Sequence, residues 1–590
     1  MKLNNSKLIL ITFGLVAGMV IIQACKKSFL DAHPYGQYDA NLIKTKEGLK
    51  NLLIGVYGVL DGQNISGDGW EGSAVNWATA GVAADDDYKG TDANDQPQMT
   101  EVEQYASQPA NRYFLNKWIV LYDGISRANE VIRLANDPEV EGLTDDDRKA
   151  TIAQARFLRA HFHFDAKRLW NKIPYIDEVT ETYDNATDAW SKIEADFQFG
   201  YDNLPESWPS DQKARVNKWA AAAYLAKCYM FEKRFADAKA LYDVIIVSGK
   251  NSSGVKYGLA TNYQDLYDPN FDNGPESVFA ISAASSGSVD QAGETSLGLA
   301  FPYGGDFGCC GFFQPSQNLV NSYKTGADGL PLFTTFNDAD LKNDQGLKDA
   351  DAYLNDVTQP LDPRLDWAVG RRGIPFYDWG PHPGYSWIRD QNYAGPYSPK
   401  KHIFTKAQEN VLTSSGWKNI TAKDIYIIRY ADVLLMAAEA EIEVGSLATA
   451  MGYVNLVRAR AASPTGRVMG RITGFTGGDN TKPIVDDSQP AGNYVINQYT
   501  SFPDQTYART AVRFERRLEL SHEGHRFFDL VRWGIAAETL NGYLAKEKLK
   551  RTYKSTAAFT AGKNEYFPLP ASIIDLAAKN GNTLTQNPGY

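Results

Sequence analysis

The sequence predicts an all-α protein in which a helical scaffold carries long, aromatic-rich loops. Apolar residues recur at helical spacing through much of residues 25–250. Two further segments, 218–250 and 429–461, combine small and aromatic residues as expected of closely packed helix pairs. Between these pairs, residues 268–421 are rich in Gly, Pro, Trp and Tyr and have little helical period. Residues 463–485 are another Gly-rich stretch, poorer in aromatic residues, and are also expected to form a loop. Because loops usually carry function, we expect it to reside there.

Three segments of the N-terminal part fit amphipathic helices. In residues 45–62, leucines and valines recur at helical intervals, and a glycine closes the run. Residues 111–136 repeat this pattern with aromatic residues on one face. Residues 144–170 open with Thr144 as an N-cap, and acidic residues in the first turn suit the helix dipole.

The helix pairs at 218–250 and 429–461 resemble tetratricopeptide hairpins. Small residues at the hairpin offsets allow two helices to approach closely, and aromatic residues fill the groove between them. In the second pair, Ala438 and Ala450 take the small positions on either side of a turn at Gly445. Repeats of a solenoid are contiguous, so the long separation of the two pairs indicates an insertion.

We expect the regions of the chain to pack as one unit. Residues 1–24 form a lipoprotein signal peptide, 25–250 an N-terminal helical region and 268–590 a C-terminal region. The C-terminal region contains the loop-rich insertion 268–421, the helical hairpin 424–462 and helices within 507–545.

The N-terminus predicts export and a lipid anchor. Lys2 and Lys7 precede the apolar run 8–22, which is shorter than the ~20 residues of a membrane span. The run ends in "IIQAC", which resembles a bacterial lipobox, in which the Cys25 thiol is lipidated and becomes the mature N-terminus. Two or more acyl chains would anchor the protein firmly. The alternative is an ordinary signal peptide with an incidental cysteine.

The composition argues against nucleic-acid binding and against a fold stabilised by many disulfides. A net charge of −11 without a long Lys/Arg block argues against nucleic acid as a partner. Beyond Cys25 the chain has only Cys228, Cys309 and Cys310, so a disulfide framework is excluded and one thiol stays free. Cys228 lies in an apolar helical run and is expected in the core.

The stretch "RFERRLELSHEGHRFFDLVRWG", residues 513–534, is the densest in charge and is tested first as a catalytic or metal site. His522 and His525 are three apart, whereas the zinc motif HExxH needs four, and Gly524 interrupts the helix between them. Arginines and glutamates alternate at helical spacing, as in Arg516 and Glu519. Buried charges need partners, so the pattern favours a paired polar cluster that holds the scaffold together.

No other catalytic signature stands out. The chain lacks a GxSxG motif, a phosphate loop and a GxGxxG motif. A carboxylate pair for glycoside hydrolysis stays open, because 71 acidic residues are present and none is marked. We therefore expect no catalytic residue, no metal and no cofactor.

The charged stretch also carries a family resemblance. "RRLELSHEGHRFFDLVRWG" is similar to the signature of the SusD/RagB family, surface nutrient-binding lipoproteins of Bacteroidetes-type bacteria. Further matching pieces are "CKKSFLD", "ARFLRAHFHFDAKRLWNKIPYI", "LDPRLDWAV", "YADVLLMAAEAEIEVG", "VNLVRARA" and "LTQNPGY". One departure is Arg516–Arg517, where the family usually has Glu–Arg; Glu515 just before keeps the charge count.

The resemblance implies a SusD-like helical fold and a surface-exposed, lipid-anchored protein of the outer membrane that binds without catalysis. It further implies a TonB-dependent, SusC-like transporter barrel as partner, to which an oligosaccharide or polysaccharide is handed. A peptide-binding RagB-like receptor is the alternative, and a surface glycoside hydrolase is a third reading.

Candidate ligand contacts are chosen from the aromatic loops. Sugar rings stack their C–H faces on aromatic planes, and their hydroxyls need amides and carboxylates. The candidates are Trp70, Trp77, Asp86, Tyr303, Phe307, Phe312, Gln314, Trp379, Tyr385 and Trp387. The competing reading, for Trp77 and Phe313 above all, is that such aromatic residues are core residues that anchor the loops.

Overall fold

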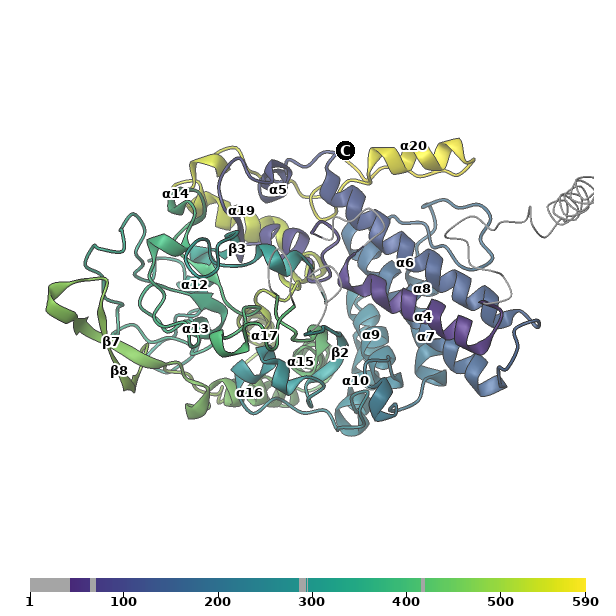
Figure 1. Cartoon of the computed structure of the whole chain (residues 1–590), viewed down its shortest axis with the longest axis horizontal. Coiled ribbons are helices and arrows are strands. Elements are labelled where there is room, and N and C mark those ends of the chain that lie inside the picture. The colour runs from purple at the N-terminus through teal and green to yellow at the C-terminus, as the bar shows by residue number, and fades with distance from the viewer. Residues whose placement is uncertain (1–42, 64–69, 286–292, 294, 415–419) are drawn as a thin grey trace, which may run out of the picture.

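Long helices form one side of the molecule, and short elements joined by loops form the other (Figure 1). The computed structural model describes residues 43–590 apart from 64–69, 286–292, 294 and 415–419. The N-terminal helices are α4 (Lys46–Tyr57), α6 (Arg112–Asn136), α7 (Asp145–Trp170), α8 (Trp190–Asn203), α9 (Lys218–Phe231) and α10 (Phe235–Ser248). The C-terminal helices are α15 (Tyr430–Val444), α16 (Leu447–Ala461), α17 (Gln505–Leu520), α18 (Arg526–Arg532), α19 (Ala536–Glu547) and α20 (Ala571–Lys579). The predicted all-α class is confirmed.

Helix starts follow capping residues that the sequence marks. The Thr144 hydroxyl accepts a hydrogen bond from the Asp147 N–H at 3.1 Å, and the Asp147 carboxylate accepts one from the Thr144 N–H at 3.2 Å. This capping box fixes the first residue of α7. At α6, the Asn111 side chain accepts from the Tyr113 N–H at 3.0 Å.

The two helix pairs predicted around the insertion lie against each other. Helices α9 and α10 form the first pair, α15 and α16 form the second, and α10 packs on α15. A buried ion pair of 2.9 Å joins Lys227 of α9 to Asp432 of α15. The Tyr242 hydroxyl of α10 donates to the Met436 sulfur at 3.2 Å. The chain therefore leaves this helical layer where the insertion begins and returns to the same layer where it ends.

The loop-rich side contains only short elements. They are α5 (Pro97–Glu103), α12 (Gln317–Ser322), α13 (Leu365–Ala368), α14 (Gln391–Ala394), β1 (Asp87–Gly90), β2 (Ser277–Ile281), β3 (Phe312–Pro315), β4 (Val369–Gly370), β5 (Ser398–Pro399) and β6 (Ile425–Arg429). The strands form two-stranded antiparallel sheets, in which β1 pairs with β3, β2 with β6 and β4 with β5. The β1–β3 pair, with Tyr88 opposite Gln314, ties the N-terminal loop to the insertion.

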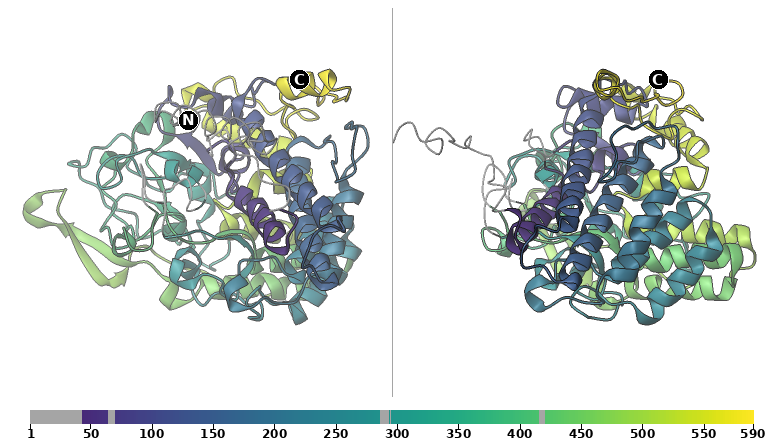
Figure 2. Two further views of the ribbon diagram at one scale, coloured as in Figure 1. Left: turned by 45° about the vertical axis from the view of Figure 1, so that its right-hand side comes forward. Right: turned by 90° about the vertical axis from the view of Figure 1, so that its right-hand side faces the viewer.

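A Gly-rich segment predicted as a loop forms a hairpin instead. Strands β7 (Met469–Phe475) and β8 (Pro483–Pro490) pair antiparallel and extend away from the body (Figures 1 and 2). Gly477 and Gly478 in the connection have φ of 61° and 76°, a left-handed backbone that glycine adopts without strain. The glycines that suggested a loop therefore supply the reversal of a hairpin.

The charged stretch 513–534 is a buried ion-pair network, as predicted. Arg516, in α17, lies between Asp432 and Asp529 with N–O distances of 2.6 and 2.9 Å. Arg517 contacts Asp86 at 2.8 Å, which joins the C-terminal helices to the N-terminal loop. All these side chains are buried, so each charge depends on its partners.

Buried neutral histidines and a buried thiol complete the core. His161 and His163 are 8% and 0% exposed. The His163 ring stacks on Tyr175 with centroids 4.3 Å apart. Cys228 is free and fully buried, as expected of a core residue. Within the described part of the chain, no helix has the length and apolar character that crossing a membrane requires.

Candidate functional site

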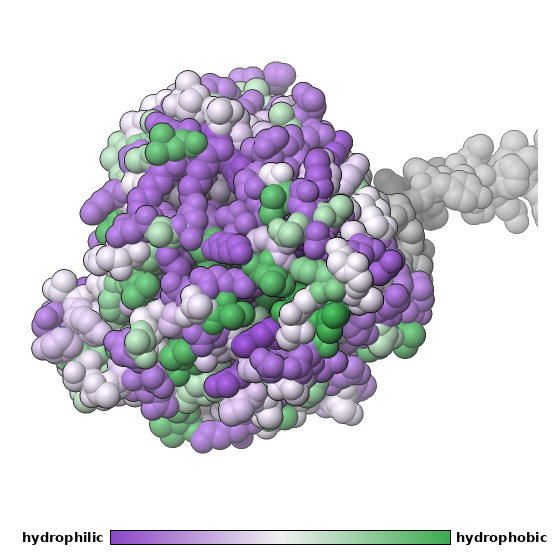
Figure 3. Space-filling view, turned by 90° about the vertical axis from the view of Figure 1, so that its left-hand side faces the viewer, coloured by the Kyte–Doolittle hydropathy of each residue, from purple (hydrophilic) through white to green (hydrophobic). Residues whose placement is uncertain are grey.

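Three loops from distant parts of the sequence meet beyond the β1–β3 pair. The Thr91 N–H donates to the Gly311 carbonyl at 2.5 Å, which extends the pairing past Gly90. The Tyr303 N–H donates to the Trp387 carbonyl at 2.9 Å. The loops 91–96, 303–311 and 385–389 therefore form one continuous surface on the loop-rich side. Much of the surface on this side is hydrophilic, and hydrophobic residues form small patches across it (Figure 3).

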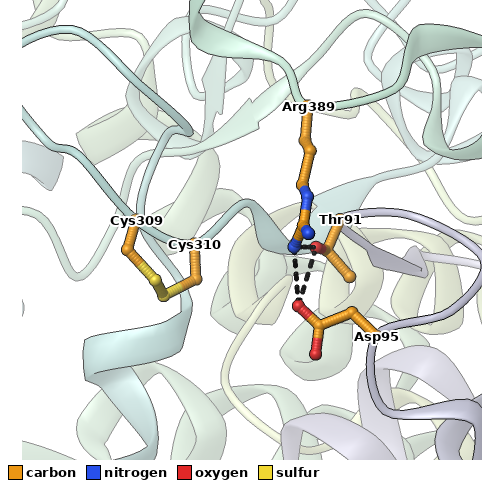
Figure 4. The surroundings of a disulfide bond; sticks show 5 residues. All are labelled: Thr91, Asp95, Cys309, Cys310 and Arg389. Carbon is orange, nitrogen blue, oxygen red and sulfur yellow. Dashed lines mark hydrogen bonds and ion pairs between the residues drawn. A yellow bond between two sulfur atoms is a disulfide. The ribbon is translucent and has the colours of Figure 1, made fainter.

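Arg389 is the centre of this surface. Its guanidinium contacts the Asp95 carboxylate at 2.7 Å and the Thr91 hydroxyl at 2.7 Å (Figure 4). It also contacts the Asp92 carboxylate at 2.8 Å. The same guanidinium lies 5.4 Å from the centre of the Tyr303 ring. The side chains of Arg389, Asp92 and Asp95 are 32%, 27% and 33% exposed, so a ligand can reach them.

Lys89 fixes the loop that carries the two carboxylates. Its ammonium group donates to the backbone carbonyls of Asp92 at 2.7 Å and Asp95 at 2.5 Å. Burial lowers the pKa of Lys89 to about 8, although nearby carboxylates, Glu103 first among them, act in the opposite direction. The loop backbone is therefore held from inside, and the carboxylates face outward with Arg389.

The loop 303–311 is shaped by close packing and a disulfide. A Cβ placed on Gly305 would lie 2.5 Å from the Trp387 indole nitrogen, so only glycine fits there. Cys309 and Cys310, whose redox state the sequence left open, are joined as a vicinal disulfide beside Arg389 (Figure 4). Cys228 is then the one free thiol among the three cysteines that follow Cys25, as their odd number predicts.

Trp70 is connected to this surface through its neighbour Glu71. It is half-buried against the core, and the next residue, Glu71, contacts Arg112 at 2.8 Å. Arg112 in turn donates to the Gln96 side chain at 2.7 Å, next to Asp95. A polar path thus links the Trp70 loop to the Arg389 centre.

An aromatic cluster packs the loops 303–311 and 385–389 against Trp379. Phe307 packs against Trp379 and Trp387 with ring centroids 4.8 and 4.9 Å away. Trp379 is half-buried and has Lys406 5.5 Å from its ring centre. Tyr385 is 38% exposed, with the Lys348 ammonium 3.4 Å from its ring centre. The cluster thus presents two partly accessible rings above a buried base.

The predicted contact residues divide by burial. Four have accessible surface: Trp70, Tyr303, Trp379 and Tyr385. Six are buried, between 1% and 6% exposed: Trp77, Asp86, Phe307, Phe312, Gln314 and Trp387. The buried six offer almost no surface to a ligand in this conformation.

The roles of the buried residues are visible in their contacts. Trp77 packs edge-on against Phe312 at 5.9 Å and tilted against Phe313 at 5.7 Å, which are core contacts. Gln314 donates its amide to the Tyr397 carbonyl at 2.7 Å. Asp86 is the partner of Arg517 described above.

The charged residues of this surface could not be predicted from the sequence. Arg389, Asp92, Asp95 and Lys348 belong to no motif, and charged loop residues are common on any surface. The available signal was weak: "DDDYKGTDAND" places acidic residues beside an aromatic loop. Across the described ranges, no three or more His, Cys, Asp or Glu side chains are grouped to hold a metal ion.

Comparison with known proteins identifies the family. A model described as the SusD family matches residues 275–590. The chain belongs to the SusD family. The N-terminal part of this SusD-family chain, residues 28–230, matches a second model, described as starch-binding associating with outer membrane.

Relatives of this SusD-family chain are distant in sequence but similar in length and fold. SusD-like protein P25 of Formosa agariphila is 26% identical over 72% of this chain and 71% of its own. A SusD-like protein of Bacteroides ovatus is 24% identical over 71% of this chain and 70% of its own.

Solved structures agree over nearly the whole chain. A laminarin binding SusD-like protein superposes with a TM-score of 0.62 at 21% identity, covering 92% of this chain and 99% of its own. Surface glycan-binding protein A from Bacteroides thetaiotaomicron, in complex with laminarihexaose, gives 0.65 at 20% identity and covers 92% and 99%. The SusD-like fold expected from the resemblance is confirmed.

Proposed function

We propose that this protein is a cell-surface lipoprotein that binds oligosaccharide or polysaccharide at the loop surface centred on Arg389 and Tyr303. The observation that carries the proposal is the combination at that point of an accessible aromatic ring with an accessible guanidinium and two carboxylates. Sugar hydroxyls bind such charged groups, and the ring faces of sugars stack on aromatic side chains. Similar folds in proteins named for laminarin and laminarihexaose support glycan as the ligand class.

Binding is tested by calorimetric titration of laminarihexaose and a panel of other soluble oligosaccharides. For a glycan that binds, Tyr303→Ala should weaken affinity at least tenfold, which corresponds to about 1.4 kcal/mol. Tyr229→Ala is the matched control, because Tyr229 also carries a stacked arginine, Arg234 at 4.2 Å, but lies on α9. Unchanged binding by the Tyr303 variant would reject the site.

The same titrations separate the function classes. Binding without new reducing ends is the outcome expected of a non-catalytic binder. New reducing ends would favour the glycoside hydrolase, and binding of peptides in place of glycans would favour the RagB-like receptor.

We further propose that the protein is lipid-anchored through Cys25 and works with a TonB-dependent, SusC-like transporter. Cys25 lies outside the described residues, so this rests on the lipobox and the family. Cys25→Ala should move the protein out of the membrane fraction. Mild-detergent purification of the tagged wild type should recover a barrel protein in about equal amount; recovery of the tagged chain alone would contradict the partnership.

A further inference from the structure

A cavity that shares no lining residue with the Arg389 surface lies between α17 and α19. Its volume is about 510 Å³, within the range of small-molecule sites. Helix α17 contributes Thr510, Arg513, Phe514 and Arg517 to its lining. The other walls come from the loop 333–337 and from residues 533–546.

Charged side chains line the cavity, and most of them are paired. Its lining contains the cations Arg513, Arg517, Arg526 and Lys546 and the carboxylates Asp85 and Glu538. Asp85 is fully engaged, because it contacts Arg526 at 2.7 Å and Arg517 at 3.1 Å. Glu538 is solvent-exposed at the rim. Arg517 is also paired with Asp86 at 2.8 Å and Lys546 with Asp338 at 3.4 Å, so these cations have carboxylate partners.

Arg513 is the cation that lacks a protein anion. Among the described residues, it makes no ion pair and no hydrogen bond. The carboxylate of Glu439, which acts on it electrostatically, is occupied by two bonds from Arg532 at 2.6 and 2.7 Å and one from the Trp533 indole at 2.9 Å. Burial and the neighbouring Arg532 charge lower the pKa of Arg513.

The geometry of Arg513 leaves its hydrogen-bond donors free. Its guanidinium carbon lies 5.2 Å from the centre of the Trp533 ring. Stacking on an aromatic ring uses the face of the guanidinium and leaves the in-plane N–H groups available. Such a fork matches the two oxygens of a carboxylate or a sulfate.

Aromatic side chains line the same cavity as Arg513. Phe514 packs against Phe333 and Phe336 with centroids 5.5 Å apart in both pairs. All three rings are partly exposed to the cavity, and Asn318, Asn337 and Thr539 add neutral polar groups. Aromatic faces with scattered polar groups suit a sugar ring.

We propose that this cavity binds an acidic sugar, with its carboxylate or sulfate on Arg513 and its ring against the Phe514 cluster. The free fork suits an oxyanion, and the aromatic wall favours one carried on a ring over an inorganic ion. This second site is separate from the Arg389 surface, so its failure and the failure of the proposed function can be told apart.

The test is calorimetric titration at about 50 mM NaCl, where screening of charges is weak. The probes are trigalacturonate, its fully methyl-esterified form as the neutral match, and inorganic sulfate. Wild-type protein should bind trigalacturonate at least tenfold more tightly than the ester. Arg513→Gln should abolish this difference, whereas Arg133→Gln, an exposed arginine of α6, should not.

A second variant blocks the cavity without disturbing charge or core. A Cβ on Gly542, which lines the cavity on α19, would meet nothing within 4 Å, so Gly542→Trp should fold normally and exclude the trisaccharide. Gly452→Trp, equally unobstructed on α16, is the matched control and should bind as wild type.

Three results would overturn the proposal. These are equal affinity for trigalacturonate and its ester, normal binding by both Arg513→Gln and Gly542→Trp, or sulfate binding as tightly as trigalacturonate. In the last case the ring would contribute nothing, and the cavity would be a simple anion site.

Discussion

Glu519 pairs with three buried arginines. Replacing it with a neutral residue should therefore measure how much the buried ion-pair network stabilises the fold. Its carboxylate accepts from Arg364 at 2.8 Å, from Arg429 at 2.5 Å and from Arg460. Glu519 is 0% exposed, and these arginines hold the pKa of its carboxyl well below the usual range although burial acts to raise it. Glu519→Gln keeps the shape and removes the charge.

The expected loss follows from the number and burial of these contacts. Removing one partner of a buried pair costs about 3–5 kcal/mol, because a charge is left without compensation. The entropy of unfolding is about 2.1 cal/mol/K per residue, or roughly 1.2 kcal/mol/K for a chain of this length. Glu519→Gln should therefore lower the melting temperature by about 3–4 °C.

Differential scanning calorimetry and urea titration measure this change. Glu47→Gln is the matched control, because Glu47 pairs only with Lys50 on the surface, where ion pairs contribute about 0–1 kcal/mol. If the two variants shift the melting temperature equally, the network does not stabilise the fold in the way argued. A loss confined to Glu519→Gln supports it.

Two further outcomes are expected. All six described histidines have pKa values lowered by burial, five of them to about 3 and His402 to about 4, so the folded state binds fewer protons than the unfolded one. The free energy of unfolding should therefore fall as pH drops below about 6.5, by up to about 2 kcal/mol per histidine between pH 7 and 5. Urea midpoints that stay constant over this range would contradict the prediction. Trp387→Ala, in the buried aromatic cluster, should cost about 3–5 kcal/mol of stability, whereas Trp70→Ala at the half-buried loop should cost less; equal thermal shifts would show that burial does not separate them.

Helices were predictable because periodicity and caps act locally. Thr144 and Asn111 mark helix starts by bonding to backbone N–H groups two or three residues ahead, which sequence alone can show. The β7–β8 hairpin was missed because its glycines suit both a loop and a tight reversal. Pairing of its strands depends on contacts that a single sequence does not display.

Site residues were harder to predict than the fold. Trp70 and Trp77 stand in the same Gly-rich stretch, yet one is half-buried and the other is 1% exposed. An aromatic residue on a loop can anchor that loop or face a ligand, and only tertiary packing decides between them. Arg389 acquires its importance from carboxylates nearly 300 residues earlier, at Asp92 and Asp95, and no local pattern signals such a meeting.

The pairing of Asp86 with Arg517 spans 431 residues and has a consequence for the order of synthesis. A chain that emerges from its N-terminus holds the carboxylates of Asp85 and Asp86 without these partners until the helix α17 has appeared. Burying them earlier would leave them uncompensated, so the N-terminal half cannot settle into its final packing first. A nascent chain stalled before residue 517 should therefore remain open to proteases around β1, and a fragment ending at residue 250 should not fold as an independent domain.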